Sequence, residues 1–397
     1  MAHSRYLIVG GGMSAAAAVD GIREVDPDGD IVIISREPDP PYKRPPLSKA
    51  LWKGDPLDSI WRHVEDKGVE LHLTDEVTKI DPAGKTVTTS GGQEYSYDKL
   101  LLATGGTPRQ LPLGISEDRI IYYRSANDYR KLRDWTEHGK RFAVIGGGFI
   151  GSEVAAALAM NDLDVTLIFP EAGICARMFP ADLSSSLNDY YGEKGVRVLA
   201  GRKVTGGSNR DGQVALTVES DDGSSEELVV DGVVAGIGIA PNLQLAKDAG
   251  LDTNDGVVVN EQLQTSAPDV YAAGDVAEFY NPTLGTRLRV EHEDNANSMG
   301  KLAGRNMAGA GESYTHLPFF YSDLFDLGYE AVGEVDSRHQ TYADWKDPYR
   351  EGVVYYLEGG RVRGVLNWNT WDQVGPATEL IAEPGPFSEQ DLKGRLP

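Results

Sequence analysis

The chain has 397 residues, 40% of them hydrophobic and 25% charged, and its 38 basic and 61 acidic residues give a formal net charge of −23. This composition excludes a disordered or collagen-like chain, and the length predicts two to three globular domains. The negative charge opposes binding to nucleic acid and to anionic lipid, and no apolar run reaches the ~18 residues that a membrane span needs. Such acidity is typical of a highly soluble or salt-adapted protein, or alternatively marks a surface for a basic partner.

The cysteine and histidine content limits the possible chemistry. Cys175 stands alone, which excludes an intrachain disulfide, a CxxxxC redox pair and a CxxC metal knuckle. The seven histidines show no HxH or HxxxH spacing, so we expect no metal site. The first residues lead directly into a strand-like run without a secretory apolar segment, and we expect a cytoplasmic protein.

Two copies of one strand–turn–helix pattern lie 136 residues apart. The first is RYLIVGGG at residues 5–12, and the second is RFAVIGGG at residues 141–148; each continues into an Ala-rich helical stretch. In such a unit the glycines permit a tight turn and a close approach of pyrophosphate, while the helix N-terminus binds the phosphates. The key positions are Gly10, Gly12 and Ala15 in the first copy and Gly146, Gly148 and Gly151 in the second. The duplication predicts two dinucleotide-binding folds.

An acidic residue ~20 positions beyond such a turn binds a ribose hydroxyl. In the second copy this residue is Glu171, and its carboxylate would repel a 2′-phosphate, which predicts NADH over NADPH. Arg177 keeps the alternative open, because a nearby arginine can hold a 2′-phosphate. In the first copy the candidate is Glu37, directly after Arg36, unless Glu37 is only a solvated loop charge.

Two further segments predict that the first nucleotide is FAD. The run LLLATGGTP at residues 100–108 is an apolar strand followed by a Gly-rich turn. The run TSAPDVYAAGD at residues 265–275 ends in Gly274 and Asp275, and a carboxylate there is suited to accept a hydrogen bond from the ribityl chain. Each segment alone is an ordinary strand end, but this order around two fingerprints is typical of flavoproteins with two dinucleotide-binding domains.

The segment PYKRPPLSK at residues 41–49 resembles that of the oxygenase-coupled ferredoxin reductases and of the apoptosis-inducing factor family. The likeness to the apoptosis-inducing factor branch covers essentially the whole chain. It is carried by Leu51-Trp52, LLLATGGTPR, GGGFIGSE, the FPE turn, RVEHEDNA, YSDL…GYEAVGEVDS and GVVYYLEGGRVRGVLNWN. The chain resembles a bacterial-type relative of this family.

The resemblance implies a catalytic set beside the flavin. Lys49 would lie near flavin N5, where a cation stabilises the reduced flavin, and Glu153 would pair with Lys49 and orient it. Phe149 would gate or stack between flavin and nicotinamide, unless it only packs in the core. Glu291 and His292 would lie beside the flavin ring and the nicotinamide amide, although a lone histidine is often structural.

The resemblance also implies two cofactor-binding sets. Within them, Arg44 and Arg124 would contact FAD phosphate or ring edges, or else are surface charges. The FAD set comprises Gly10, Gly12, Ala15, Arg36, Glu37, Arg44, Lys49, Val77, Ala103, Thr104, Gly105, Arg124, Gly274, Asp275, Glu291, His292 and Tyr321. The NAD set comprises Gly146, Gly148, Phe149, Ile150, Gly151, Glu153, Glu171, Arg177, Gly238 and Glu291.

Some positions depart from the family patterns. Glu293 stands where the ferredoxin reductases have a tryptophan, and Tyr321 stands where apoptosis-inducing factor has one. The acidic ribose residue of that family aligns with Arg36, one position before Glu37. Its long regulatory insertion near the C-terminus has no counterpart here, and we expect no mitochondrial targeting segment. These two differences and the acidity of the chain favour the redox chemistry over a DNA-binding death function. Cys175 is expected to be structural.

The predicted fold class is α/β, with two Rossmann-like dinucleotide-binding domains and a C-terminal α+β domain. Residues 1–117 and 252–317 would form a split FAD domain, residues 118–251 an inserted NAD domain, and residues 318–397 the C-terminal interface domain. Two Gly-rich hairpins are expected, around Ser208–Ser225 and within VVYYLEGGRVRGVLNW, and the final stretch EPGPFSEQDLKGRLP is expected to be a poorly ordered or loosely docked tail.

The predicted mechanism is a hydride relay in which NADH reduces FAD and the flavin passes electrons to a second acceptor. The acceptor is a quinone-like compound, oxygen or a protein. Two alternatives stay open: a ferredoxin reductase that supplies an iron–sulfur protein, and an NADH-sensing module in which reduction controls homodimerisation.

Overall fold

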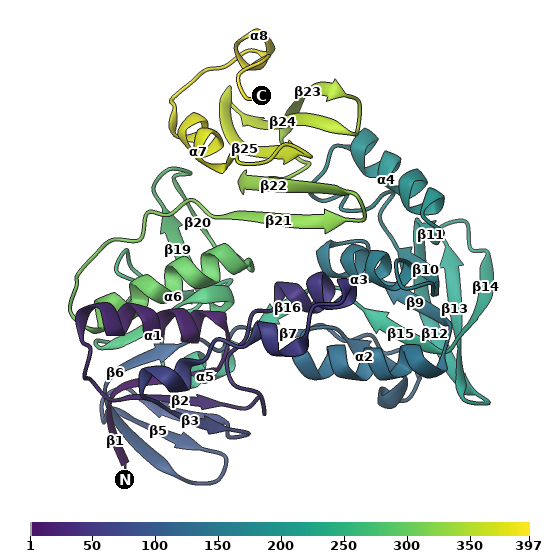
Figure 1. Ribbon diagram of the computed structural model, residues 1–397. Helices are drawn as coiled ribbons and strands as arrows, with labels where there is room; N and C mark the ends of the chain where they lie inside the picture. The colour runs from purple at the N-terminus through teal and green to yellow at the C-terminus, as the bar shows by residue number, and fades with distance from the viewer. Residues whose placement is uncertain (1) are drawn as a thin grey trace. The chain divides into compact units, whose positions relative to one another are not determined.

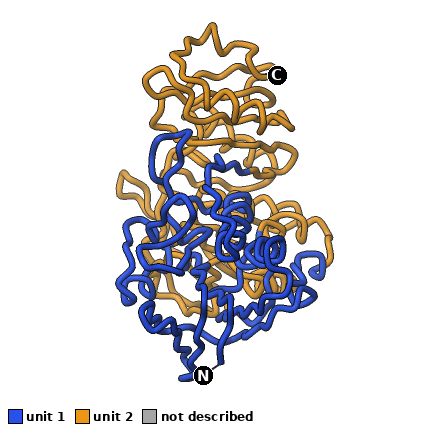
Figure 2. The backbone as a smooth tube through the Cα atoms, turned by 90° about the vertical axis from the view of Figure 1, so that its left-hand side faces the viewer, with its two compact units in different colours: residues 1–44, 57–107, 240–320 blue, residues 45–56, 108–239, 321–397 orange. Residues whose placement is uncertain are grey.

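The computed structural model describes residues 2–397, which fall into two compact units (Figures 1 and 2). Unit 1 comprises residues 1–44, 57–107 and 240–320, and unit 2 comprises residues 45–56, 108–239 and 321–397. The predicted α/β class is confirmed, because each unit contains a largely parallel sheet with helices packed on it. The finer division into three domains stays a prediction.

The main sheet of unit 1 has the strand order β3-β2-β1-β6-β5-β4, and β18 pairs with β6 as well. The strands β3, β2, β1, β6 and β18 are parallel, whereas β5 runs antiparallel to β6 and to β4. Their bounds are β1 Ala2–Val9, β2 Ile31–Ser35, β3 Val69–Leu73, β4 Val77–Asp81, β5 Thr86–Thr89, β6 Glu94–Leu102 and β18 Val270–Ala272. Every residue of β2 is buried, as expected for a parallel strand covered on both faces.

Two long helices cover this sheet. The helices α1 (Met13–Val25) and α6 (Glu293–Met307) pack closely against each other, and both contribute buried side chains to the core of unit 1 (Figure 1). The Ala-rich sequence of α1 suits this contact, because small side chains let two helix backbones approach. Unit 1 also contains α5 Gln244–Asp248 and a small sheet of β17 Val257–Val258, β19 Ala277–Asn281 and β20 Thr286–Leu288. The short strands β7 Gly106–Pro108 and β16 Ile239–Pro241 pair with each other.

The main sheet of unit 2 is entirely parallel, with the order β11-β10-β9-β15-β8. The strands are β8 Ile120–Tyr122, β9 Arg141–Ile145, β10 Asp164–Phe169, β11 Val196–Ala200 and β15 Gly232–Ala235, and the accompanying helices are α2 Ala126–His138, α3 Phe149–Ala159 and α4 Ala181–Glu193. The Gly-rich hairpin predicted around residues 208–225 belongs to a three-stranded antiparallel sheet. Its strands are β12 Arg202–Arg210, β13 Gln213–Ser220 and β14 Ser225–Val230.

The C-terminal part of unit 2 is a five-stranded sheet with the order β21-β22-β25-β24-β23. Its elements are β21 Phe319–Leu324, β22 Leu327–Gly333, β23 Gln340–Asp347, β24 Glu351–Glu358, β25 Arg361–Trp368, α7 Val374–Ala382 and α8 Glu389–Leu392. The predicted hairpin is β24–β25, and its turn residues Gly359 and Gly360 have φ values of +58° and +78°. Both dihedrals are left-handed, as a tight two-residue hairpin turn requires.

The final stretch is docked, so the prediction of a loose tail is wrong. Leu392 and Leu396 are buried, and the Leu396 amide donates to the Tyr355 hydroxyl at 3.2 Å. Ser388 and Asp391 form a capping box that starts α8. The two buried leucines therefore anchor the segment, because each removes apolar surface from water.

No helix within residues 2–397 is long and apolar enough to cross a membrane.

Candidate functional site

The two Gly-rich turns have nearly the same backbone. Gly12 precedes α1 with φ −88° and ψ −168°, and Gly148 precedes α3 with φ −84° and ψ −165°. Gly10 and Gly146 have φ values of +110° and +112°, which side chains rarely adopt. A Cβ on Gly10 would lie 2.3 Å from the carbonyl oxygen of Ala103. The turns therefore require glycine at their first position.

The last of the three consecutive glycines in each turn, Gly12 or Gly148, faces open space. A Cβ added at Gly12 or Gly148 would meet no described atom within 4 Å. No described side chain caps the N-terminus of α1 or α3, so the first N–H groups of both helices point at this open space. An open cradle at a helix N-terminus is suited to a pyrophosphate. Both turns thus fit a dinucleotide, one in each unit.

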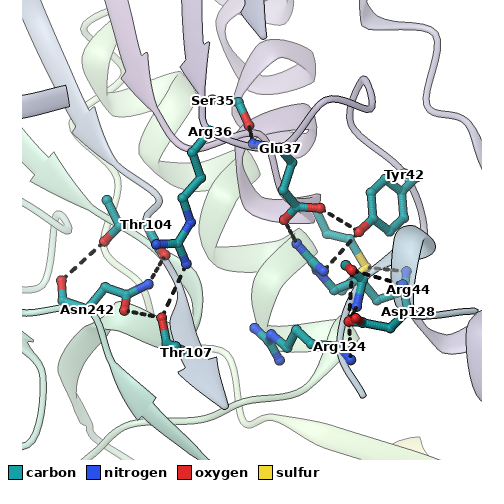
Figure 3. Close-up of polar contacts among 12 residues, drawn as sticks. Ser35, Arg36, Glu37, Tyr42, Arg44, Thr104, Thr107, Arg124, Asp128 and Asn242 are labelled. Atoms are coloured by element: carbon teal, nitrogen blue, oxygen red, sulfur yellow. Dashed lines mark hydrogen bonds and ion pairs between the residues drawn. The ribbon is translucent and has the colours of Figure 1, made fainter. Parts of the chain in front are cut away.

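A polar cluster follows β2 in unit 1. The carboxylate of Glu37 accepts from the Arg44 guanidinium at 2.5 Å and from the Tyr42 hydroxyl at 2.6 Å (Figure 3). The Arg44 guanidinium also donates to the Tyr42 hydroxyl at 3.0 Å. Burial by itself would lower the pKa of Arg44, but the negative charges of Glu37 and Asp275 and the oxygen of Tyr42 raise it. Glu37 is therefore held by protein partners, and its role toward a ribose stays a prediction.

The turn after β6 lies at the same sheet edge, because β2, β1 and β6 are neighbouring parallel strands. Its residues Ala103 and Gly105 flank Thr104, whose carbonyl accepts from the Asn242 side-chain amide at 2.8 Å. Asn242 also accepts from the Thr107 hydroxyl at 2.8 Å (Figure 3). The sequence predictions missed Asn242, since an asparagine after a proline is an ordinary loop signal.

Arg36 points to the same turn. Its guanidinium donates to the Thr107 hydroxyl at 3.2 Å (Figure 3). A second guanidinium nitrogen lies 3.9 Å from the Glu76 carboxylate. Its side chain is 57% exposed, so the cation remains accessible to a phosphate or an adenine ring. Val77, the remaining predicted FAD residue in this region, is buried in the core of unit 1 at the start of β4.

Asp275 lies in a short 3-10 helix that packs against the first turn. Gly274 has φ +78°, and a Cβ there would lie 2.2 Å from the Ser14 hydroxyl in α1. Arg289 donates to the Asp275 carbonyl at 3.2 Å and to the Glu291 carboxylate at 2.6 Å. The sequence predictions missed Arg289, which is only 11% exposed and connects two of the predicted site residues.

His292 directly precedes α6 in unit 1. Its ring stacks on Phe320 with a centroid distance of 4.0 Å and an interplanar angle of 13°. The stack fixes the plane of the imidazole. Ala15 is buried in α1, as expected for a position where helix and strand approach.

Unit 2 contains the predicted lysine–glutamate pair. Lys49 Nζ lies 2.6 Å from Glu153 Oε1, and the two side chains are 11% and 4% exposed. Glu153 is on α3, one turn after Gly148, while Lys49 lies between two short 3-10 helices in residues 45–53. The Tyr321 ring, 41% exposed, lies with its centroid 5.6 Å from Lys49 Nζ. The contact predicted from the resemblance is present, and its role toward a flavin stays a prediction.

The other predicted residues of unit 2 lie at the ends of its parallel strands and the starts of its helices. Phe149 is the first residue of α3 and is half-buried, and Ile150 is 39% exposed. Gly238 follows β15 with φ +87°. Arg124 precedes α2, where its backbone amide donates to Asp128 at 3.0 Å (Figure 3). Phe149 and Ile150 thus begin a helix, Arg124 lies just before a helix, and Gly238 lies just after a parallel strand.

Glu171 follows β10 at the same sheet edge as the second turn. Its carboxylate accepts from Arg177 Nε at 3.2 Å and from a terminal guanidinium nitrogen at 2.9 Å. Glu171 is 28% exposed, and Arg177 is 87% exposed. The backbone carbonyls of both residues accept hydrogen bonds, that of Glu171 from the Gly201 amide and that of Arg177 from the Ser337 amide, so the two residues differ in the exposure of their side chains.

Cys175 is buried, with φ +55°, and its amide donates to the Gly147 carbonyl at 2.7 Å. Burial raises the pKa of its thiol to about 12, and the nearby charge of Glu153 acts in the same direction. The expectation of a structural cysteine agrees with this environment, since the thiolate is the reactive form.

A family profile described as "Pyridine nucleotide-disulphide oxidoreductase" matches residues 4–300. A second profile, described as "Apoptosis-inducing factor, mitochondrion-associated, C-term", matches residues 303–347. Together they cover most of the chain, from residue 4 to residue 347.

Individual proteins agree with these profiles. The chain is 36% identical to apoptosis-inducing factor 1, mitochondrial, of Dictyostelium discoideum, over 95% of this chain and 78% of that protein. It is 34% identical to monodehydroascorbate reductase 3 of Arabidopsis thaliana, over 97% and 94% of the two chains. The crystal structure of a covalent putidaredoxin reductase–putidaredoxin complex superposes with a TM-score of 0.90, at 30% identity, over 98% of this chain and 95% of that chain.

Proposed function

The chain belongs to the pyridine nucleotide-disulphide oxidoreductase family, and from this premise we propose that it uses NADH to reduce a small quinone-like acceptor. Like the members of its family, it is an NAD(P)H-dependent flavoprotein oxidoreductase with FAD and NAD(H) as cofactors. Bound FAD supplies the redox chemistry, since it accepts a hydride and returns electrons to an acceptor. The single observation that carries the proposal is the pair of matching open Gly-rich turns, one in each unit.

The residues of the chain supply binding and electrostatics. The N–H groups at the start of α1 and α3 bind the two pyrophosphates, and Asp275 binds the ribityl chain. Lys49, held by Glu153, supplies a positive charge that favours the reduced, anionic form of the flavin. Phe149, Glu291 and His292 position the nicotinamide, while Arg36, Arg44 and Arg124 contact the FAD phosphates or ring edges.

We propose that NADH is preferred over NADPH because of Glu171, which lies after β10. Its carboxylate accepts hydrogen bonds from ribose hydroxyls and repels a 2′-phosphate. Changing Glu171→Ala removes charge-assisted hydrogen bonds of ~1.5–3 kcal/mol, so the KM for NADH rises about tenfold or more while the KM for NADPH falls. Steady-state kinetics with both nucleotides measures this change. The variant Arg177→Gln is the matched comparison: if it weakens NADPH use alone, Arg177 holds the 2′-phosphate. An unchanged NADH-to-NADPH ratio in Glu171→Ala contradicts the proposal.

The acceptor is proposed to be small because the chain carries a net charge of −23, which slows the encounter with an acidic protein. The similarity to a monodehydroascorbate reductase, named for a small organic substrate, supports the same choice. Oxygen is the simplest competing acceptor. We further propose a cytoplasmic location.

The decisive experiment is an anaerobic titration of the holoprotein with NADH and, separately, NADPH, followed by flavin absorbance. Bleaching by NADH, then rapid recovery on addition of a soluble quinone, supports the proposal. A broad long-wavelength band that persists after air is admitted supports instead the NADH-sensing alternative, and a change in molecular mass on reduction would show the dimerisation it requires. No bleaching by either nucleotide excludes hydride transfer to the flavin.

A second candidate acceptor is a ferredoxin-like iron–sulfur protein. The observation that favours it is the structural similarity to a reductase captured in a complex with its redoxin. Glu293, which stands where the ferredoxin reductases have a tryptophan, counts against it. The same reduced protein, mixed with a ferredoxin in place of the quinone, distinguishes the two: faster recovery with ferredoxin selects the second candidate.

A further inference from the structure

The buried carboxylate of Glu153 has more partners than Lys49. Its Oε1 accepts from Lys49 Nζ at 2.6 Å and from the Ser322 hydroxyl at 2.5 Å. Its Oε2 accepts from the Ser48 hydroxyl at 2.5 Å. Ser48 and Ser322 are themselves 5% and 0% exposed. Three donors thus surround a carboxylate that water barely reaches, and two of them carry no charge.

The two serines come from distant parts of unit 2. Ser48 directly precedes Lys49 in the chain, whereas Ser322 is on β21 of the C-terminal sheet, 169 residues after Glu153. The neighbouring strand β22, which pairs with β21, contributes Tyr329. Tyr329 is buried and stacks on Trp368, with an interplanar angle of 8° and a centroid distance of 5.7 Å. Ser322 is therefore anchored to the aromatic core of this sheet.

The uncharged donors change how Lys49 and Glu153 interact. A carboxylate with a single ammonium partner directs its full negative charge at that ammonium and largely cancels the positive field. Hydroxyl donors stabilise the negative charge without neutralising it, and they fix the plane of the carboxylate. Lys49 then has one defined position, at Oε1, and part of its positive field remains effective outside the pair.

We propose that Ser48 and Ser322 are positioning residues that hold the Glu153 carboxylate so that Lys49 keeps its place and its field toward the flavin. This inference rests on the proposed function, because it takes Lys49 to act on the flavin. The C-terminal sheet thereby contributes to the redox properties of the site through Ser322, in addition to any interface that it forms.

The test compares Ser322→Ala and Ser48→Ala with the wild-type holoprotein. We measure the midpoint potential of the bound flavin by anaerobic dye titration, and the rate of flavin reduction by NADH in a stopped-flow spectrometer. Both variants are expected to have a more negative potential and a reduction rate about tenfold lower, as is typical when a residue that orients a site residue is removed. The KM for NADH is expected to change less than the reduction rate, because neither serine is in the NAD set and only Glu153, which both serines contact, belongs to it. The variant Ser322→Thr keeps a hydroxyl and is expected to restore both values.

Ser184→Ala is the matched control, since Ser184 is also a buried serine of unit 2 whose hydroxyl donates, in this case to the Ile174 carbonyl at 2.6 Å. A potential equal to wild type in both Ser48→Ala and Ser322→Ala overturns the proposal, and so does an equal shift in Ser184→Ala. If either alanine variant fails to retain FAD, the potentials of the other alanine variant and of Ser322→Thr still test the proposal. A wild-type protein that NADH does not reduce refutes the proposed function instead, so the two failures are distinguishable.

Discussion

At the residue scale, the Lys49–Glu153 pair is a buried ion pair in unit 2. Taking two charges out of water is costly, and only good geometry with further hydrogen bonds compensates for that loss. The 2.6 Å contact and the two serine hydroxyls meet this condition. Removal of one member of the pair should therefore lower the free energy of unfolding more than replacement of both members.

Changing Lys49→Met leaves the Glu153 carboxylate buried without its cation, so the free energy of unfolding falls by ~3–5 kcal/mol. Urea denaturation of the holoprotein, followed by fluorescence, measures this change. The control is Lys53→Met, which breaks the exposed pair of Lys53 and Asp323 at 3.2 Å and changes the free energy by less than ~1 kcal/mol. Equal effects of the two substitutions would show that burial of the Lys49–Glu153 pair is energetically unimportant.

The thiol of Cys175 has a pKa raised to about 12 by burial, against an ordinary value of 9.0. Because the folded-state pKa is the higher one, the contribution to stability is complete below pH 9.0 and is lost as the pH rises toward about 12. At pH 8 we expect iodoacetamide to leave the folded protein unmodified and to alkylate Cys175 once urea unfolds it. Mass spectrometry detects the added group. Rapid alkylation of the folded protein would mean that the thiol is reactive.

At the element scale, the two turns require the same backbone conformation, and of their three key positions only one holds a different residue. The third position is Ala15 in the first copy and Gly151 in the second. A Cβ at Gly151 would lie 1.8 Å from the Gly146 carbonyl oxygen, closer than any real contact. The second helix therefore sits tighter against its turn than the first.

Changing Gly151→Ala forces α3 away from the turn, so the NADH-binding end of unit 2 is distorted and the KM for NADH rises at least tenfold, which corresponds to ~1.4 kcal/mol. Steady-state kinetics and the thermal unfolding midpoint measure the two effects. The matched control is Gly192→Ala in α4, where a Cβ would meet no described atom within 4 Å. This second substitution is expected to stabilise the helix slightly. A normal KM in Gly151→Ala would contradict the tight packing.

The docked C-terminal stretch shows why element boundaries are harder to predict than element types. Its composition of proline, glycine and charged residues is typical of a tail. The capping box of Ser388 and Asp391 is visible in the sequence, but it describes one short helix and says nothing about what that helix contacts. The burial of Leu392 and Leu396 depends on a sheet formed by residues far earlier in the chain.

At the scale of the whole molecule, the dominant property is the charge of −23. With an acidic protein as acceptor, raising the salt concentration from 0.01 M to 0.15 M shortens the screening length from ~30 Å to ~8 Å and speeds the encounter. With a neutral quinone the same change has little effect. We expect salt-independent rates of reoxidation by quinone and salt-accelerated rates with any acidic ferredoxin, both measured by stopped-flow absorbance. A quinone rate that rises steeply with salt would contradict the expected neutral encounter.

The sequence by itself determined the α/β class, the duplicated turns and the family. These follow from local physics: glycine alone adopts the φ values of Gly10 and Gly146, and continuous apolar runs form buried parallel strands. Only the tertiary structure decided the partners of the polar groups. It placed Ser48 and Ser322 on Glu153 and Asn242 on Thr104, because these contacts depend on how distant strands and loops pack, and sequence spacing does not encode that packing.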